Sequence, residues 1–263
     1  DHAQTPYIDS LYNKYPNASL RTDGLHVGLP EGQMGNSEVG HMNLGAGRIV
    51  YQDLAKINLA LKDNTLAKEK VLVEAFKYAK ENNKNLHFLG LLSDGGVHSH
   101  INHLKGLVDA ANDYGVQNSF IHAFTDGRDV DPKSGKNFVS DLENYISKTN
   151  TKIATITGRY YAMDRDKRWE RVKLAYDAIV NGIGIKSKNV VESIQESYDT
   201  TITDEFIKPI ILTDNNNEPV TVLKDDDVVI FFNFRTDRGR ELTEMLSQKH
   251  FHEYNTHKLD LYY

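Results

Sequence analysis

A single serine in a glycine-rich segment is the first candidate for chemistry in this chain. Ser37 lies within residues 34–48, MGNSEVGHMNLGAGR, just before a predicted helix. A helix N-terminus presents unpaired N–H groups and the positive end of the helix dipole, which favours an anion or phosphoryl group on the hydroxyl. The neighbouring glycines support a nucleophile, since glycine lets the backbone approach a ligand closely. The simpler alternative is a serine that only caps the helix.

Arginines recur after the apolar runs of the chain. They are Arg128, Arg159, Arg165, Arg235 and Arg238. A guanidinium group binds phosphate or carboxylate through two parallel hydrogen bonds, which the ammonium group of lysine cannot do. Such residues in an acidic protein indicate a pocket for a ligand that carries both groups. Each arginine alone would also fit a surface turn or a charge before a helix.

Two further residues are candidates for proton transfer. His98 follows an apolar run and precedes a predicted helix, so its neutral ring can donate to a phosphoryl oxygen or transfer a proton near neutral pH. Asp129 follows Arg128 directly and can accept a hydroxyl proton in the same pocket. Asp126 is expected to shape the turn, and His103 is expected on the exposed face of the following helix.

The predicted elements bring these residues together. Compact apolar runs predict buried strands, and runs at helical spacing lie between them. The predicted strands are 86–92, 120–124, 153–156 and 227–232. Strands that alternate with helices form an α/β fold, here a mostly parallel sheet with flanking helices. Because open α/β sheets bind ligands beyond the carboxyl ends of their strands, we expect one site built from the loops that follow them.

Composition disfavours several classes of function. The 263 residues carry a formal net charge of −6, which argues against nucleic acid or a membrane surface as a partner. There is no cysteine, which excludes disulfides and thiolate zinc sites and fits a reducing compartment such as the cytoplasm. No apolar stretch approaches the roughly 18 residues of a membrane span, and no signal-peptide pattern opens the chain. The expected partner is a small-molecule substrate.

Five segments, in this order, resemble cofactor-independent (2,3-bisphosphoglycerate-independent) phosphoglycerate mutase. They are MGNSEVGHMNLGAGR at 34–48, LLSDGGVHSH at 91–100, TDGRDVDP at 125–132, GRYYAMDRDKRWERV at 158–172 and FFNFRTDRGREL at 231–242. The resemblance covers essentially the whole chain. It implies an isomerase of glycolysis and gluconeogenesis that interconverts 3-phosphoglycerate and 2-phosphoglycerate (phosphoglycerate being the substrate) through a phosphoserine intermediate.

The resemblance also implies roles for individual residues. Ser37 would accept the phosphoryl group and contact one metal ion, and Asp129 would accept protons from the glycerate hydroxyls. Two divalent metal ions, manganese in most members, would lower the pKa of the serine. The implied substrate-binding residues are His98, Arg128, Asp129, Arg159, Arg165, Arg235 and Arg238.

The same resemblance implies a chain truncated at both ends. Residues 1–51 match part of a phosphatase-like domain of the alkaline phosphatase superfamily, which holds the metals and the serine. Residues 52–263 match most of the phosphotransferase domain inserted into it. The family's metal-ligating Asp and His residues lie largely before and after the matched region. We therefore expect most metal ligands to be absent from this chain, and the chain alone to be an inactive monomer.

Two alternatives stay open on the sequence. One is a phosphomonoesterase of the alkaline phosphatase superfamily, which the serine and the metals alone would permit. The arginine-rich region argues for retention of a three-carbon acid rather than its release. The other is a non-catalytic module that binds a phosphorylated ligand, which the missing metal ligands make a real possibility for this chain.

Overall fold

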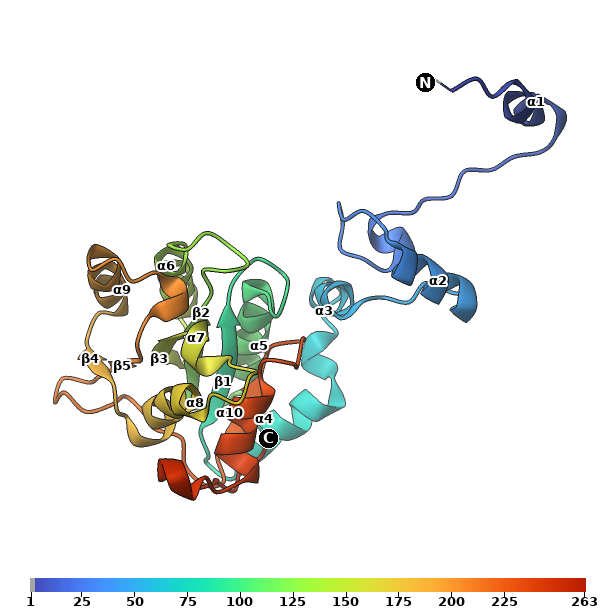
Figure 1. The fold of residues 1–263 in the computed structure, drawn as a ribbon. Helices are drawn as coiled ribbons and strands as arrows, with labels where there is room; N and C mark the ends of the chain where they lie inside the picture. The colour runs from blue at the N-terminus through green and yellow to red at the C-terminus, as the bar shows by residue number, and fades with distance from the viewer. Residues whose placement is uncertain (1–2) are drawn as a thin grey trace. The chain divides into compact units, whose positions relative to one another are not determined.

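The computed structural model describes residues 3–263, and the chain divides into two compact units, 1–56 and 57–263 (Figure 1). Helix α3 (Asp53–Lys62) runs across the division. The division follows Lys56, whereas the sequence placed a domain boundary after Tyr51. The assignment of the two parts to domains of a longer enzyme stays a prediction.

The first unit is small and mostly exposed. Its helices are α1 (Pro6–Lys14) and α2 (Ser37–Ala46). Proline at the start of α1 suits the first helical position, where its missing N–H is not needed. Gly47 ends α2 in the left-handed region, with φ of 62°. Asn43 connects α2 to two other segments of the first unit. Its side-chain Nδ2 atom donates to Val27 O at 2.9 Å, and its Oδ1 atom accepts the N–H of Val50 at 2.7 Å.

The second unit is built on a six-stranded sheet with the order β4-β5-β3-β2-β1-β6 within the described residues. The strands are β1 (Leu86–Leu92), β2 (Ser119–Thr125), β3 (Thr151–Gly158), β4 (Ile185–Ser187), β5 (Ile210–Leu212) and β6 (Val228–Phe231). Strands β1, β2, β3 and β6 are mutually parallel. Strand β5 is antiparallel to β3 and parallel to the edge strand β4. The predicted α/β class with a mostly parallel sheet is confirmed.

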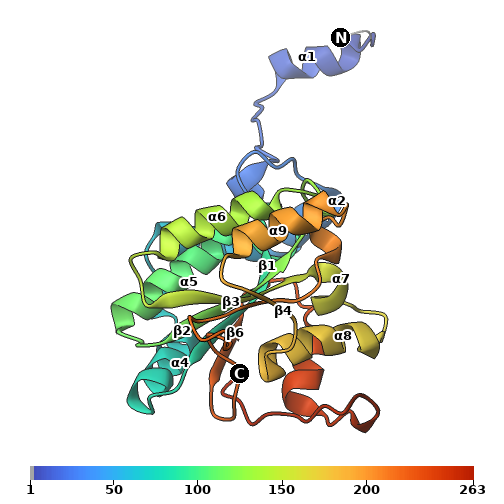
Figure 2. The same cartoon turned by 90° about the vertical axis from the view of Figure 1, so that its left-hand side faces the viewer.

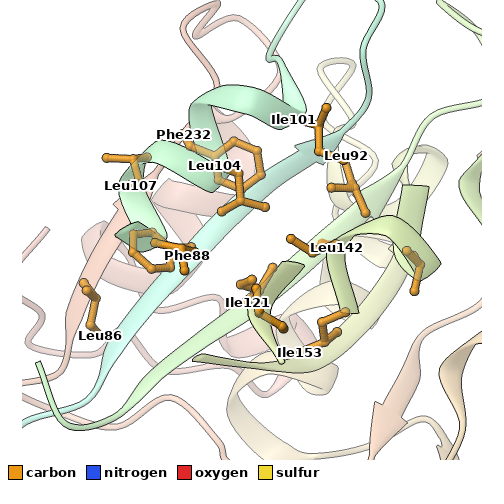
Figure 3. Close-up of a cluster of buried hydrophobic side chains, with 14 of the residues drawn as sticks. Leu86, Phe88, Leu92, Ile101, Leu104, Leu107, Ile121, Leu142, Ile153 and Phe232 are labelled. Carbon is orange, nitrogen blue, oxygen red and sulfur yellow. The ribbon is translucent and has the colours of Figure 1, made fainter. Parts of the chain in front are cut away.

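Helices cover both faces of this sheet (Figure 2). The helices of the second unit after α3 are α4 (Lys70–Glu81), α5 (Ile101–Tyr114), α6 (Gly135–Ile146), α7 (Arg159–Ala162), α8 (Trp169–Tyr176), α9 (Val190–Asp199) and α10 (Arg240–Thr243). Helices α4, α5, α6 and α9 pack on one face, around buried residues such as Phe88, Leu104 and Leu142 (Figure 3). Helices α7, α8 and α10 cover the other face.

The parallel strands bring four loops to one edge of the sheet. Strands β1, β2, β3 and β6 all point the same way, so the segments that follow Leu92, Thr125, Gly158 and Phe231 leave from the same side. The strands themselves are anchored by apolar burial, and β1 is buried along its whole length. The predicted meeting of these loops at the carboxyl ends of the strands is confirmed.

Candidate functional site

Ser37 is the first residue of α2 and lies exposed in the first unit. The capping alternative is wrong, because Asn36 is the N-cap and its side chain accepts the N–H of Val39 at 3.0 Å. The hydroxyl lies 3.3 Å from His41 Nδ1, but the same nitrogen lies 2.7 Å from the Ser37 carbonyl oxygen. That short contact requires a proton on Nδ1, so His41 is not arranged to take a proton from Ser37. Ser37 is therefore free of a capping role and has no general base in His41.

In the second unit, a buried ion cluster joins the loops after β2 and β3. Arg159 opens α7 and is 4 % exposed, and its Nη1 atom donates to Asp126 Oδ1 at 2.6 Å and to Asp129 Oδ2 at 2.7 Å. Asp126 Oδ2 also accepts the Ser93 hydroxyl at 2.7 Å. The backbone N–H groups of Arg128 and Asp129 donate to Asp126 Oδ1 at 3.1 and 3.0 Å. Asp126 thus shapes the turn, as predicted, and also fixes the Arg159 guanidinium.

The charges in this cluster stabilise one another. Burial alone would raise the pKa of Asp126, but hydrogen bonds from Ser93, the two backbone N–H groups and Arg159 outweigh it and lower that pKa. Burial also works against the charge of Arg159, and the two carboxylates reverse the effect, so the pKa of Arg159 is raised. Asp126 and Arg159 are therefore both ionised and held in one geometry, as a preorganised anion site requires.

His98 lies between the two acidic groups of the site and is buried. Its Nε2 atom is 3.9 Å from Asp129 Oδ2, and its Nδ1 atom is 3.7 Å from Asp237 Oδ1. Both distances exceed a hydrogen bond, and within residues 3–263 Nδ1 has no partner. Burial and then the positive charge of Arg159 lower the pKa of His98, so the ring is neutral near pH 7. A neutral ring with a free nitrogen is suited to meet a ligand oxygen.

Asp237 gathers two of the predicted arginines. It accepts from Arg165 Nη1 at 2.9 Å and from Arg235 Nη2 at 3.2 Å. Burial opposes ionisation of Asp237, but these arginines and His98 lower its pKa. Arg165 comes from the loop after β3 and Arg235 from the loop after β6, so Asp237 joins the two loops. Sequence reasoning did not single out Asp237, although an acid between Arg235 and Arg238 was a visible signal.

A cavity of about 300 Å³ opens beside these groups. Its lining includes Arg128, Arg159, Arg165, Arg168, Arg171 and Arg238. Arg238 donates to Met163 O at 3.1 Å, and burial together with the neighbouring arginines lowers its pKa. Because neighbouring arginines lower the pKa of Arg238, positive charge is concentrated in this cavity. A bound anion would reduce the repulsion between these guanidinium groups. Four of the five predicted arginines meet here, while Arg235 lines a separate cavity of about 460 Å³ and faces Asp237.

Comparisons with known proteins show the family of the chain. The family model of the BPG-independent PGAM N-terminus matches residues 57–263. The chain belongs to the BPG-independent phosphoglycerate mutase family.

Relatives and a solved structure place the family in context. The chain is 69 % identical over 263 residues to a 2,3-bisphosphoglycerate-independent phosphoglycerate mutase of Flavobacterium johnsoniae, covering 100 % of this chain and 52 % of that protein. It is 70 % identical to the Flavobacterium psychrophilum protein of that name, with the same coverage of each chain. A crystal structure of Leishmania mexicana phosphoglycerate mutase at low cobalt concentration has a TM-score of 0.77 at 33 % identity, covering 99 % of this chain and 50 % of that one. The chain therefore spans about half the length of the family members it matches.

Two further arginines of this member of the phosphoglycerate mutase family line the cavity but were not predicted from the sequence. Arg168 lies 2.6 Å from Asp166 and 3.4 Å from Asp164. Arg171 stacks on the Tyr160 ring, with its guanidinium carbon 3.8 Å from the ring centroid. Both belong to the stretch before and within α8, where charged residues are usual on an exposed helix face. Only their position along the cavity distinguishes them from ordinary surface arginines.

One histidine prediction is wrong. His103 is 2 % exposed and its Nε2 atom lies 2.8 Å from Asn58 Oδ1, whereas the sequence analysis placed it on the exposed face of α5. Burial lowers its pKa to about 4. The helical spacing was correct, but α3 and the loop after β6 cover this side of α5, with Phe234 against the His103 ring. His100 caps α5 instead, accepting the N–H of Asn102 at 3.2 Å.

The described residues do not supply a complete site for the metals expected in the family. Within residues 3–263, no group of three or more His, Asp or Glu residues is arranged to hold a metal ion. The Nδ1 atom of His41 is engaged by the Ser37 carbonyl oxygen at 2.7 Å, so that nitrogen is not free to hold a metal ion beside Ser37. A separate observation concerns membranes: in the part of the chain that the structure describes, no helix combines the length and apolarity needed for a transmembrane span.

Proposed function

We propose that the protein containing this chain is a phosphoglycerate mutase that interconverts 3-phosphoglycerate and 2-phosphoglycerate through a phosphoserine at Ser37. The arginine-lined cavity of the second unit supports this proposal most directly. Phosphoglycerate carries a phosphate at one end and a carboxylate at the other. Several guanidinium groups fixed around one small cavity suit a small molecule with two anionic ends better than they suit a single phosphate.

The proposed reaction transfers the phosphoryl group from the substrate to Ser37 and then back to the other hydroxyl of glycerate. The Ser37 hydroxyl gives up its proton as its oxygen bonds to phosphorus, the bond from phosphorus to the substrate oxygen breaks, and that oxygen takes up a proton, which leaves glycerate in the cavity. Glycerate then turns so that its other hydroxyl attacks the phosphoserine. Arg159, Arg165 and Arg238 would hold the three-carbon acid between the two transfers. Retention of glycerate is what distinguishes a mutase from a phosphatase.

Two residues would handle protons on the glycerate hydroxyls. The Asp129 carboxylate lies 2.7 Å from Arg159 Nη1, which fixes its position and leaves its other oxygen available to accept a proton. His98 lies 3.9 Å from Asp129 and carries an unpartnered ring nitrogen within the described residues. We assign His98 the role of a hydrogen-bond donor to an oxygen of the substrate, and Asp129 the role of proton acceptor.

The metal ions belong to the proposal for the whole protein. Two divalent ions, manganese by resemblance to the family, would contact Ser37 there. Most of their ligands would come from outside residues 1–263, in keeping with a chain that spans about half the length of its relatives. We further propose a cytoplasmic, monomeric enzyme, which the absence of cysteine supports for the compartment.

An activity assay and a binding assay together test the proposal. The full-length protein with manganese should convert 3-phosphoglycerate to 2-phosphoglycerate, and the 263-residue chain should not. Release of inorganic phosphate and glycerate by the full-length protein, without isomerisation, would favour the phosphomonoesterase instead. Absence of both reactions from the full-length protein would favour a non-catalytic binding module.

Calorimetry on the 263-residue chain tests the cavity by itself. We expect metal-independent binding of 3-phosphoglycerate that is lost in Arg238→Ala and weakened in Arg235→Ala. Arg240→Ala is the control for Arg238→Ala, because Arg240 is close in the chain, is exposed, and lines the separate cavity of about 460 Å³ instead of the arginine-lined one. Equal loss of binding in all three variants would show a general charge effect and would contradict the cavity as the binding site.

A further inference from the structure

Two buried carboxyl groups lie at the arginine-lined cavity: Asp164 is part of its lining, and Glu241 follows the loop that carries Arg238. Asp164 belongs to the loop after β3, next to Arg165, and is 5 % exposed. Glu241 belongs to α10, shortly after Arg238, and is 7 % exposed. The reaction proposed above gives neither residue a role. Buried acids without a function in the chemistry require a structural explanation.

Both carboxyl groups hold the same turn. Asp164 Oδ2 accepts the backbone N–H groups of Asp166 at 2.9 Å and Arg168 at 3.0 Å. Glu241 Oε1 accepts the N–H of Lys167 at 2.8 Å. Lys167 has a φ of 59°, in the left-handed region that a lysine seldom adopts, so the turn depends on these bonds.

One oxygen of this arrangement lacks a donor. Glu241 Oε2 is buried and, within residues 3–263, has no hydrogen-bond partner when the group is treated as a carboxylate. Because Asp164 and Glu241 accept the N–H groups of the consecutive residues Arg168 and Lys167, their carboxyl groups lie close together, and a hydrogen bond between them requires a proton on one of the two. A proton on Glu241 would turn its unpaired oxygen into a donor toward Asp164. It would also remove the repulsion between two buried negative charges.

The surroundings favour Glu241 as the protonated partner. Burial raises the pKa of Glu241, and the hydrogen bond to Asp164 raises it further. Burial also opposes ionisation of Asp164, but the N–H groups of Arg168 and Asp166 outweigh it and lower that pKa. The Arg168 and Arg171 Nη1 atoms lie 3.4 and 3.6 Å from Asp164 Oδ1, while the charge of Asp166 acts on Glu241. Two cations therefore lie close to Asp164, whereas the negative charges of Asp164 and Asp166 raise the pKa of Glu241.

We infer that Glu241 is a positioning residue that shares a proton with Asp164 and thereby locks the two arginine-bearing loops of the cavity together. The lock lies beside two direct links between the same loops, Arg165 to Asp237 at 2.9 Å and Arg238 to the Met163 carbonyl at 3.1 Å. Its effect on a ligand rests on the proposed function, since the cavity is where phosphoglycerate would bind. The lock itself is a property of the protein without ligand.

Loss of the shared proton should loosen the cavity. As the pH rises through the pKa of Glu241, both carboxyl groups become charged and repel each other. The folded state, with the loops joined, binds that proton more tightly than the unfolded chain does. The contribution of the shared proton to the stability of the folded state therefore falls as the pH rises. Glu241→Gln keeps an acceptor for Lys167 and supplies an amide donor to Asp164 that does not titrate. Glu241→Leu removes both groups and serves as the variant without a lock.

Carboxyl NMR on the ligand-free chain is the first test. With ¹³C-labelled glutamate, the carboxyl signal that is missing in Glu241→Gln should titrate above the usual glutamate range near 4.3 in the wild type, while the pKa of Glu143, also raised by burial, should be the same in both proteins. The side-chain N–H signals of Arg165 and Arg238 should lose protection above that pH in the wild type and keep it in Glu241→Gln. Titration of the Glu241 carboxyl in the usual range, or arginine protection that does not follow Glu241, would overturn the inference.

Calorimetry with 3-phosphoglycerate is the second test. Ionisation of the substrate phosphate and of His98 affects wild type and Glu241→Gln alike, so the ratio of their affinities isolates Glu241. We expect the ratio to change in favour of Glu241→Gln by about tenfold between about pH 5 and pH 9, the change that one unit of pKa difference produces. A constant ratio would refute the positioning role. If neither protein binds 3-phosphoglycerate at any pH, the proposed function fails, while the NMR result still decides whether the lock exists.

Discussion

The Arg159 guanidinium and the Asp129 carboxylate meet at 2.7 Å at the carboxyl end of the sheet. The two residues come from loops that follow β3 and β2, which are adjacent and parallel, so the sheet itself sets their spacing. Asp126 accepts from the same Nη1 atom at 2.6 Å. A single guanidinium nitrogen thus links a turn-forming acid to the proposed proton acceptor. The remaining N–H groups of Arg159 are left for a ligand.

Replacement of Arg159 by lysine should weaken binding of 3-phosphoglycerate to the chain by roughly tenfold or more, because an ammonium group cannot bridge two carboxylates and also bind an anion through a planar fork. Calorimetry measures the loss. Arg159→Ala should in addition lower the free energy of unfolding by about 3–5 kcal/mol, since it leaves buried Asp126 without its cation.

Arg240→Lys is the control for this pair of variants. Arg240 is exposed and lies outside the arginine-lined cavity. The Arg240→Lys variant should have the same affinity for 3-phosphoglycerate and the same unfolding midpoint in urea as the wild type. A loss in Arg159→Lys no larger than the loss in Arg240→Lys would contradict the assignment of Arg159.

Binding of 3-phosphoglycerate should raise the pKa of His98. In the ligand-free protein, burial and Arg159 lower that pKa, and a bound anion adds a negative charge that favours the imidazolium form. NMR of the ring signals over a pH titration measures the rise. The ring signals of His250 and His252, which are exposed and outside the arginine-lined cavity, serve as internal controls. An unchanged His98 in a chain saturated with ligand would place the anion elsewhere.

The Tyr198 hydroxyl should matter for stability. It donates to the buried Asp204 carboxylate and accepts the Lys136 N–H at 3.2 Å, while Asp204 also accepts the Gly135 N–H at 2.7 Å. Tyr198→Phe leaves a buried carboxylate short of a donor, so the free energy of unfolding should fall by about 1–3 kcal/mol. Urea unfolding measures the change.

Tyr145→Phe is the matched control for Tyr198→Phe. Tyr145 also donates to an aspartate, Asp109, but this pair is exposed to water. Solvent replaces the lost bond, so the change should stay within about 0.5 kcal/mol. Similar losses in the two variants would mean that burial of Asp204 does not set the energy of its hydrogen bond.

His103 should make folding sensitive to acid. Its pKa is lowered by burial to about 4 in the folded protein, from 6.5. The unfolded chain therefore binds the proton first, and stability is lost as the pH falls from about 6.5 toward 4. We expect this group to contribute a loss of roughly 2 kcal/mol between about pH 7 and pH 4.5.

The His103 contribution is isolated by His103→Gln. Its amide can still donate to Asn58 and does not titrate. Urea unfolding at both pH values should show a smaller pH dependence for the variant than for the wild type. Equal pH dependence in both proteins would assign the acid sensitivity to other groups.

Much of the fold follows from local sequence patterns. The four parallel strands and the helices α5, α6 and α8 were predicted because each contains enough apolar residues at one spacing to define a buried face. Helix α9 was not predicted. Strands β4 and β5 were missed, since each has three residues and β4 is largely exposed, so neither carries a periodic signal. β5 is a strand because it pairs with β3, and β4 is a strand because it pairs with β5. Both partners are distant in the sequence.

The sequence by itself determined which chemical groups the chain carries and, through the alternation of strands and helices, which edge of the sheet they share. It could not decide which arginines face one cavity, because side-chain direction depends on partners far along the chain. Arg165 turns toward Asp237, Arg235 joins it from the other loop, and Arg159 is directed by Asp126. Only the tertiary structure decided these pairings, because buried charges take the geometry in which their partners offset the cost of leaving water.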